Sequence, residues 1–168
     1  MNRFDRMIAA ARVAACAVLA FVAATALWSL APLAAGLRSD VVMSGSMAPA
    51  LRPGDVVVAV PVDARTLRPG QIIVFRDPAA AGRLVVHRFI RYAPSGALIT
   101  KGDANTAEDG TPVPRSAVAG LARVRIPGAG LARYWFVTSH TGYLAVAALA
   151  LLGLVVVATR PGVAVRPA

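Results

Sequence analysis

The sequence is poor in the residues that build disulfide bonds and metal sites. Among its 168 residues Cys16 is the single cysteine, so the chain cannot form an internal disulfide bond. The two histidines are His87 and His140, and neither is accompanied by cysteines at the ligand spacing of a zinc site. We therefore expect neither a metal ion nor a cofactor.

Charged residues are missing from two long stretches. Residues 13–37 read VAACAVLAFVAATALWSLAPLAAGL, and residues 134–159 contain the run YLAVAALALLGLVVVA. Since a bilayer-spanning helix needs roughly 20 apolar residues, we predict a transmembrane helix over each range. A cleavable signal peptide is the alternative for the first, but the run is long for one and no clear cleavage site follows it. Aromatic residues near the ends that face the central segment suit an interfacial belt: Trp28, Tyr134, Trp135 and Tyr143.

Arginines near the two ends of the chain indicate its orientation. They are Arg3, Arg6 and Arg12 at one end and Arg160 and Arg166 at the other. Because short segments rich in Lys and Arg stay in the cytoplasm, residues 1–12 and 160–168 are predicted to be cytoplasmic. Residues 38–133 would then lie on the extracytoplasmic side. The chain is accordingly predicted to be a multi-pass protein of the cell membrane, with the lipid bilayer as a partner.

The net charge of +10 is compatible at first sight with nucleic-acid binding. The basic residues of the middle segment are scattered singly, however, without a Lys/Arg run and without interleaved aromatic residues. Proteins that bind single strands use such patterns. We predict no nucleic-acid partner and interpret the charge as a solvated basic surface, attracted to anionic lipid headgroups.

The middle segment is predicted to form a compact, mainly β domain. β-Branched residues dominate its apolar segments, turn signals such as RPG and APSG separate them, and no amphipathic helical period appears. The predicted strands are residues 40–43, 55–60, 71–76, 83–92, 97–102 and 118–126. The expected fold is thus a mainly β domain flanked by two transmembrane α-helices.

Few side chains in this domain suit hydrolysis, which needs a nucleophile, a base and a group that holds the base. Ser46 ends a strand ahead of a turn stiffened by proline, so its hydroxyl is expected at a domain edge, with Ser44 as a second donor on the same face. His87 shares a strand face with Val85 and Phe89. It is either a packed core histidine or a neutral imidazole that accepts a proton.

The acidic candidates follow in TKGDANTAEDGTP, as Asp103, Glu108 and Asp109. By itself this segment is typical of a surface turn. Its functional interpretation is a carboxylate that accepts the imidazole N–H and stabilises the imidazolium. Lys101, the only lysine, lies in the same segment.

In this order the motifs resemble signal peptidase I, in its endoplasmic-reticulum and archaeal-type branch. The likeness extends over residues 41–122 and the N-terminal anchor. SGSMAPAL (residues 44–51) resembles the nucleophile box, and KGDANTAED (residues 101–109) resembles the box with two aspartates. VVHRF (residues 85–89) resembles the box in which this branch has histidine and the bacterial type has a lysine base.

The resemblance implies a β-rich catalytic domain and a membrane-bound serine endopeptidase. Such an enzyme removes signal peptides from membrane-inserted preproteins, cutting after small residues at positions −1 and −3. The roles implied are Ser46 as nucleophile, His87 as general base and then acid, Asp109 as the group that orients His87, Asp103 as a second acidic member, and Ser44 and Met47 as oxyanion or substrate-binding residues.

Two features depart from the family pattern, and other functions remain open. The second predicted helix is absent from the simplest members, and residues 77–82 form only a short loop where larger bacterial enzymes insert a subdomain. The alternatives are a dedicated processing peptidase for one or a few exported proteins, a non-catalytic anchored module that binds exported segments, and a self-cleaving repressor-type domain. The histidine and the two anchors oppose the last of these.

Overall fold

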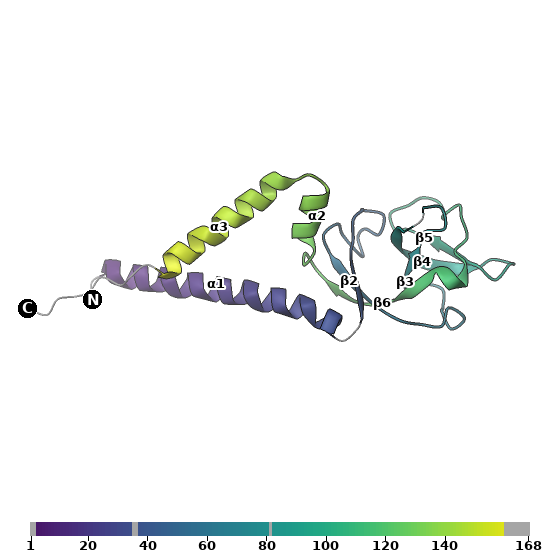
Figure 1. Ribbon diagram of the computed structural model, residues 1–168, viewed down its shortest axis with the longest axis horizontal. Coiled ribbons are helices and arrows are strands. Elements are labelled where there is room, and N and C mark those ends of the chain that lie inside the picture. The colour runs from purple at the N-terminus through teal and green to yellow at the C-terminus, as the bar shows by residue number, and fades with distance from the viewer. Residues whose placement is uncertain (1–2, 35–36, 81, 160–168) are drawn as a thin grey trace, which may run out of the picture. The chain divides into compact units, whose positions relative to one another are not determined.

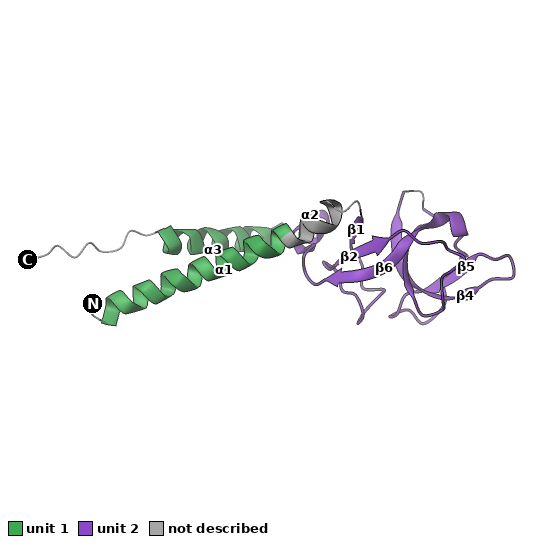
Figure 2. Ribbon diagram, turned by 90° about the horizontal axis from the view of Figure 1, so that it is seen from below, with its two compact units in different colours: residues 1–28, 139–168 green, residues 29–138 purple. Residues whose placement is uncertain are grey.

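The computed structural model describes residues 3–34, 37–80 and 82–159, and the chain divides into two compact units (Figure 2). Residues 1–28 and 139–168 form the helical unit, and residues 29–138 form the β unit. The predictions made for the Trp28 side chain, Arg160 and Arg166 concern positions outside the described part.

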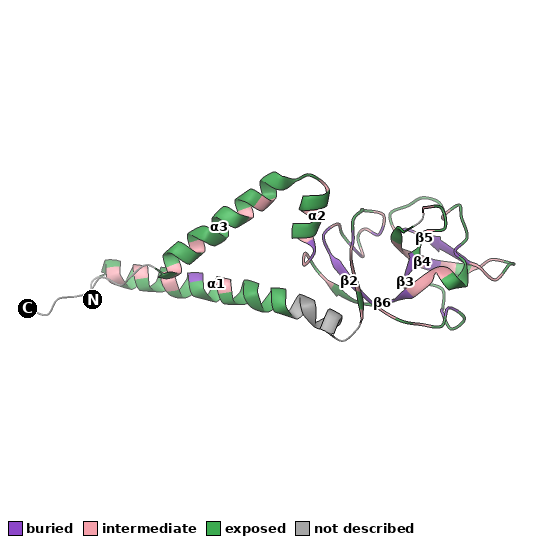
Figure 3. Cartoon of the chain, in the orientation of Figure 1, coloured by how far each residue is buried: buried purple, intermediate pink, exposed green. Residues whose placement is uncertain are grey.

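The helical unit contains α3 (Thr141–Thr159) and most of α1 (Arg3–Ala34), which are two long apolar helices (Figure 1). The segments Arg3–Leu27 and Thr141–Thr159 are long and apolar enough to cross a membrane. No residue in α3 is buried, and large apolar side chains such as Phe21 and Leu149 are 73% and 68% exposed (Figure 3). A surface helix of a water-soluble domain would instead bury one apolar stripe.

The helices do not coincide with the two uncharged stretches of the sequence. The first begins at Arg3, before residue 13, because the alanines and other good helix formers that precede the uncharged run extend it. The second apolar stretch is divided between α2 (Leu131–Val137) and α3, with a break at Ser139, whose φ is 61°. The end of α2 is fixed by Thr138, whose N–H and hydroxyl donate to the Tyr134 carbonyl at 2.9 and 2.6 Å. A residue in the left-handed conformation cannot continue an α-helix. The second uncharged stretch therefore forms two helices, of which only α3 is long and apolar.

The β unit is built on an antiparallel sheet of six strands in the order β1-β2-β6-β3-β4-β5 (Figure 1). The strands are β1 (Arg38–Val41), β2 (Val56–Val60), β3 (Ile72–Arg76), β4 (Leu84–Tyr92), β5 (Leu98–Lys101) and β6 (Val118–Ile126). The short 3₁₀ helix η1 (Arg115–Ala117) precedes β6. Each predicted strand is present within about two residues of its expected bounds, and the largest shift is in β1.

Both faces of the sheet are covered by apolar side chains. Ile73 and Phe75 of β3 belong to one cluster and Val74 to another, because alternate residues of a strand point to opposite faces. Each buried side chain of this kind contributes roughly 1.5–3 kcal/mol. Cluster one consists of Ala64, Leu67, Ile73, Phe75, Phe89, Leu98, Val113 and Leu121. Cluster two consists of Val42, Met47, Leu51, Val57, Ala59 and Val74.

Candidate active site

Ser46 lies in the turn between β1 and β2, and the side chains on either side of this turn anchor it in cluster two. Met47 is 1% exposed, and Val42 and Leu51 are also buried. The Leu51 N–H donates to the Met47 carbonyl at 2.9 Å, so the turn is fixed by backbone as well as apolar contacts. Met47 was predicted as an oxyanion or substrate-binding residue, and the structure places its side chain in the core, where it anchors the turn.

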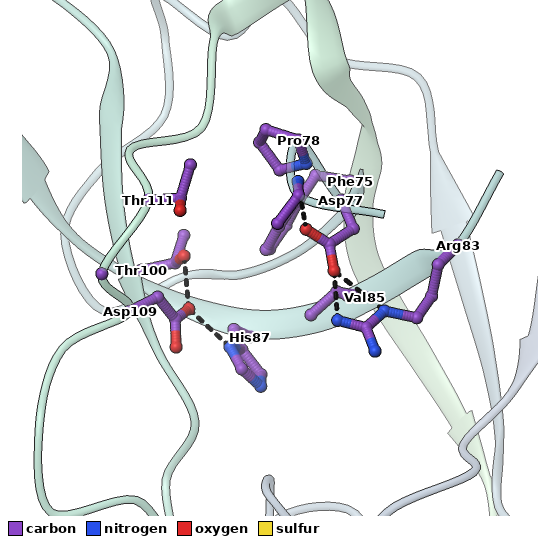
Figure 4. Close-up of a pocket in the computed structure, with 11 residues that line it drawn as sticks. Phe75, Asp77, Pro78, Arg83, Val85, His87, Thr100, Asp109 and Thr111 are labelled. Atoms are coloured by element: carbon purple, nitrogen blue, oxygen red, sulfur yellow. Dashed lines mark hydrogen bonds and ion pairs between the residues drawn. The ribbon is translucent and has the colours of Figure 1, made fainter. Parts of the chain in front are cut away.

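A chain of hydrogen bonds connects Ser46, His87 and Asp109. The His87 Nε2 lies 3.1 Å from the Ser46 Oγ. The His87 Nδ1 lies 2.6 Å from the Asp109 Oδ2, the contact drawn in Figure 4. If the carboxylate accepts the Nδ1 proton, the Nε2 lone pair faces the serine hydroxyl. The arrangement therefore suits proton transfer from Ser46 to His87.

The imidazole of His87 is held between an aromatic ring and a carboxylate. Its side chain is 12% exposed, and the ring packs edge-on against Phe75 with 6.3 Å between centroids. His87 thus faces cluster one at its rim, as the alternation with Val85 and Phe89 predicted. His87 is thus packed against the core, as one interpretation predicted, and its Nε2 also contacts the Ser46 hydroxyl, as the other requires.

Asp109 is positioned by Thr100 of β5, a residue that the sequence interpretation missed. The Thr100 hydroxyl donates to the Asp109 Oδ2 at 2.7 Å, and the Asp109 N–H donates to the Thr100 carbonyl at 2.8 Å (Figure 4). Thr100 is 1% exposed. The only signal in the sequence was a polar residue within the apolar strand ALITK.

Asp103 binds Arg88 of β4, and it is Asp109 that contacts His87. The Arg88 Nε and Nη2 donate to the two Asp103 carboxylate oxygens at 2.8 and 2.6 Å, and Nη1 donates to the Gly70 carbonyl at 2.5 Å. The hydrogen bonds that Arg88 donates to Asp103 raise the pKa of Arg88. The pair attaches the turn after β5 to the strand that carries His87. Asp103 is therefore a positioning residue, and Arg88 is its missed partner.

The turn that follows β5 also contacts the serine directly. A Cβ on Gly102 would lie 2.6 Å from the Ser46 carbonyl oxygen and 3.0 Å from the Ser46 Cβ. The Ala104 N–H donates to that carbonyl at 2.8 Å. Only glycine allows this approach, so the Lys-Gly-Asp motif fixes the serine backbone as well as supplying an aspartate.

Ser44 is placed as a second hydroxyl beside the nucleophile. Its Oγ lies 3.2 Å from the Ser46 Oγ, and the side chain is exposed. The Ser46 N–H makes no hydrogen bond within the described ranges. The Ser46 N–H and the Ser44 hydroxyl are therefore the candidate donors to an oxyanion beside Ser46.

A groove of about 530 Å³ lies between β1 and β4, lined by Met43 on one side and Leu84 and Val86 on the other. β1 is an edge strand. β4 pairs with β5 only from Arg88 onwards, so one edge of Leu84–His87 has no strand partner in the described part of the sheet. Two unpaired strand edges therefore border the groove.

A smaller cavity of about 200 Å³ borders His87 and Asp109 (Figure 4). Phe75 and Val85 form part of its wall, and an ion pair between Arg83 and Asp77 lies at its margin. Across residues 3–34, 37–80 and 82–159 no three His, Cys, Asp or Glu side chains come together as a metal site.

No protein-family model matches the chain, and no curated protein matches it.

Proposed function

We propose that the protein is a membrane-bound serine endopeptidase that removes signal peptides from exported preproteins. The observation that carries this proposal is the hydrogen-bonded chain Ser46–His87–Asp109. The three residues come from separate motifs, in the order that the family resemblance requires. The joint placement of a hydroxyl, an imidazole and a carboxylate is the pattern of nucleophilic hydrolases.

In the proposed mechanism the Ser46 Oγ attacks the carbonyl carbon of the scissile bond while the His87 Nε2 takes its proton. Asp109 keeps the imidazole oriented and stabilises the imidazolium. The Ser46 N–H and the Ser44 hydroxyl stabilise the oxyanion. His87 then gives the proton to the leaving amine, and water hydrolyses the resulting ester on Ser46 with His87 again acting as base.

The proposed substrate is an extended polypeptide segment in the groove. An added strand could form backbone hydrogen bonds with the free edges of β1 and β4, as in β-augmentation. Met43 and Val86 in the groove lining are the sequence neighbours of Ser44 and His87, which places the end of the groove close to the pair in the chain. A preference for small side chains near the scissile bond is part of the proposal, since a pocket selects size by steric exclusion.

The helical unit supports the choice of membrane-inserted preproteins as substrates. Helices α1 and α3 would both span the bilayer, with the β unit on the extracytoplasmic side and the two chain ends in the cytoplasm. A signal peptide enters the membrane as a helix, and its cleavage site leaves the bilayer on that same side. Anchoring therefore brings the proposed catalyst and its substrate to one surface.

Cleavage of a model preprotein with an Ala-x-Ala site, in detergent or liposomes, tests the function. We expect the wild type to cut after the second alanine. Ser46→Ala and His87→Ala should each lower kcat by roughly 10⁴-fold or more. Ser116→Ala, which removes an exposed hydroxyl elsewhere in the β unit, is the matched control and should retain full activity.

The outcomes separate the alternatives. Folded wild type that cuts no general preprotein would argue for a dedicated substrate or a binding role. Full activity in Ser46→Ala would show that the mechanism is wrong. Activity in His87→Lys would further mark residue 87 as the position of the base.

A further inference from the structure

Helix α2 is fixed to the β unit at its first residues. The Gly130 N–H donates to the Gly54 carbonyl at 2.8 Å, and a Cβ on Gly54 would clash with the Leu131 side chain. A Cβ on Gly130 would lie 2.6 Å from a methyl carbon of Val41, at the end of β1. The two glycines therefore allow the start of α2 to pack closely against the β unit, and the Leu131 side chain marks the inner face of the helix.

The opposite face of α2 is apolar and exposed. Leu131 and the half-buried Trp135 share the inner face, because residues four apart lie on one side of a helix. Phe136 and Val137 lie on the outer face and are 71% and 57% exposed (Figure 3). Arg133, also exposed on this face, forms no ion pair within the described part of the chain. The surface helix of a water-soluble domain would instead turn polar side chains outward.

The chain passes from α2 directly into a helix that is long and apolar enough to cross a membrane. Only residues 138–140 separate Val137, the last residue of α2, from Thr141, the first residue of α3. The four Cα–Cα steps between them cover at most about 14 Å. If α3 spans the bilayer, α2 therefore ends within this distance of the point where α3 enters it.

The charge of α2 and its surroundings in the sequence suits an anionic lipid surface. No acidic residue occurs in residues 110–168. Arg133 lies three residues before Phe136, so the two side chains are neighbours on the helix surface. An arginine beside an inserted aromatic ring can keep its guanidinium at the level of the lipid phosphates.

We propose that α2 lies in the headgroup region of the membrane, with Phe136 and Val137 directed toward the acyl chains and Arg133 bound to anionic lipid phosphates. An interfacial helix of this kind buries its apolar face about 5–10 Å into the boundary between headgroups and acyl chains. The sequence assigned Tyr134 and Trp135 to an interfacial belt, whereas the structure exposes the opposite face of the same helix. The inference requires no peptidase activity. Because Arg133 also lines the groove, it would place the proposed substrate site beside the lipid surface.

The test measures tryptophan fluorescence of the full-length protein in nanodiscs of phosphatidylcholine and phosphatidylglycerol, whose two surfaces are both open to the solvent. Trp28→Phe and Trp135→Phe remove the two tryptophans of the chain, and Phe136→Trp then supplies a single probe. Ser95→Trp in the same background is the matched control, because Ser95 lies in an exposed turn of the β unit. We expect lipids brominated on the acyl chains to quench the probe at residue 136 severalfold more than the probe at residue 95. Iodide in the water should show the reverse order.

Two results would overturn the proposal. One is equal quenching of both probes by the brominated lipids. The other is a probe at residue 136 that neither quencher reaches, because a protein surface, from a second copy or another chain, would then cover α2. Val137→Trp provides a second probe on the same face and should behave like Phe136→Trp. Thermal unfolding followed by circular dichroism checks that each variant is folded.

The role of Arg133 is tested by the lipid composition. Removal of phosphatidylglycerol from the nanodiscs should reduce quenching of the residue-136 probe by brominated lipid. Arg133→Gln should reduce it to a similar extent and make it independent of phosphatidylglycerol. Quenching that depends equally on phosphatidylglycerol with and without Arg133 would contradict the assigned contact with anionic phosphates.

Discussion

Gly102 is the residue at which the two halves of the site come closest. The backbone of Ser46 occupies the space where any other residue would have a Cβ. The aspartate beside Gly102 binds Arg88, next to His87. The turn after β5 therefore helps to set the distance between Ser46 and His87, and the family resemblance alone did not reveal why glycine stands there.

Gly102→Ala is expected to lower kcat by about 10²-fold, because a displacement of Ser46 by about 1 Å is enough for such a loss. Gly110→Ala is the matched control, since a Cβ there meets nothing within 4 Å. Steady-state kinetics on the Ala-x-Ala preprotein would compare the two variants. Equal rates in both would show that the Ser46 turn adapts freely to the extra methyl group.

Among the side chains, the sequence was most informative where one residue type was scarce. His87 is the only histidine of the middle domain, so it was the one candidate base to place with a serine and an aspartate, and the structure brings the three together. The pairing of Arg88 with Asp103 was not predictable, because it depends on two turns meeting across the sheet. The burial of Met47 was also not predictable, because nothing in the local sequence shows to which side the Met47 side chain points.

At the level of secondary-structure elements, β6 joins the two halves of the β unit. It lies between β2 and β3 in the sheet. Asp55, directly before β2, holds the C-terminal end of β6. Asp55 accepts the Arg52 N–H at 2.8 Å and the Gly128 N–H at 3.0 Å, and it pairs with Arg125 at 2.7 Å. The first RPG turn signal of the sequence, at residues 52–54, indicated a turn here, but it did not indicate this long-range contact.

Asp55→Asn is expected to destabilise the β unit by about 2–3 kcal/mol at neutral pH, because the buried ion pair loses one partner. Burial disfavours the charged form of Asp55, but the Arg52 and Gly128 N–H groups and Arg125 outweigh it and lower its pKa. The stabilisation is therefore present above about pH 4, the unfolded value, and is lost as pH falls through the lower folded pKa.

Thermal unfolding followed by circular dichroism at several pH values would measure this difference. Asp63→Asn is the matched control, because Asp63 is an exposed turn residue. We expect the gap between wild type and Asp55→Asn to narrow below about pH 4. A gap that widened on acidification would contradict the assigned role of Asp55.

The strands and the helices differed in how far the sequence could define them. Each strand ended at glycine or proline signals, so the bounds were accessible from local chemistry alone. The break at Ser139 was not, because Thr138, Ser139 and His140 interrupt the apolar pattern only briefly. A serine with left-handed backbone angles is rare, so the local composition does not predict one.

For the whole molecule, the proposed topology depends on a few arginines in α1. Replacement of Arg3, Arg6 and Arg12 by glutamine should invert a substantial fraction of the chains, because positive charge near the first span retains it in the cytoplasm. Substituting Arg65, Arg68 and Arg123, which are exposed in the β unit, is the matched control. Charges in a long segment have little effect on orientation.

The orientation can be measured with a membrane-impermeant maleimide. In a Cys16→Ser background, Ser95→Cys places the single thiol in an exposed turn of the β unit. We expect labelling of intact cells with the arginines present and markedly less without them. Labelling only after the cells are opened, in the otherwise unchanged protein, would reverse the proposed sidedness.

The position of β6 between β2 and β3 has a consequence for the synthesis of the protein. Ser46 belongs to the part of the sheet made first, whereas His87 and Asp109 belong to the part beyond β6, and the strand that joins them emerges from the ribosome last. A nascent chain stopped before residue 118 would already contain all three residues without the framework that aligns them. Under the proposed function, the newly synthesised protein would have no hydrolytic activity until β6 joins β2 to β3. A fragment truncated before residue 118 would likewise be inactive.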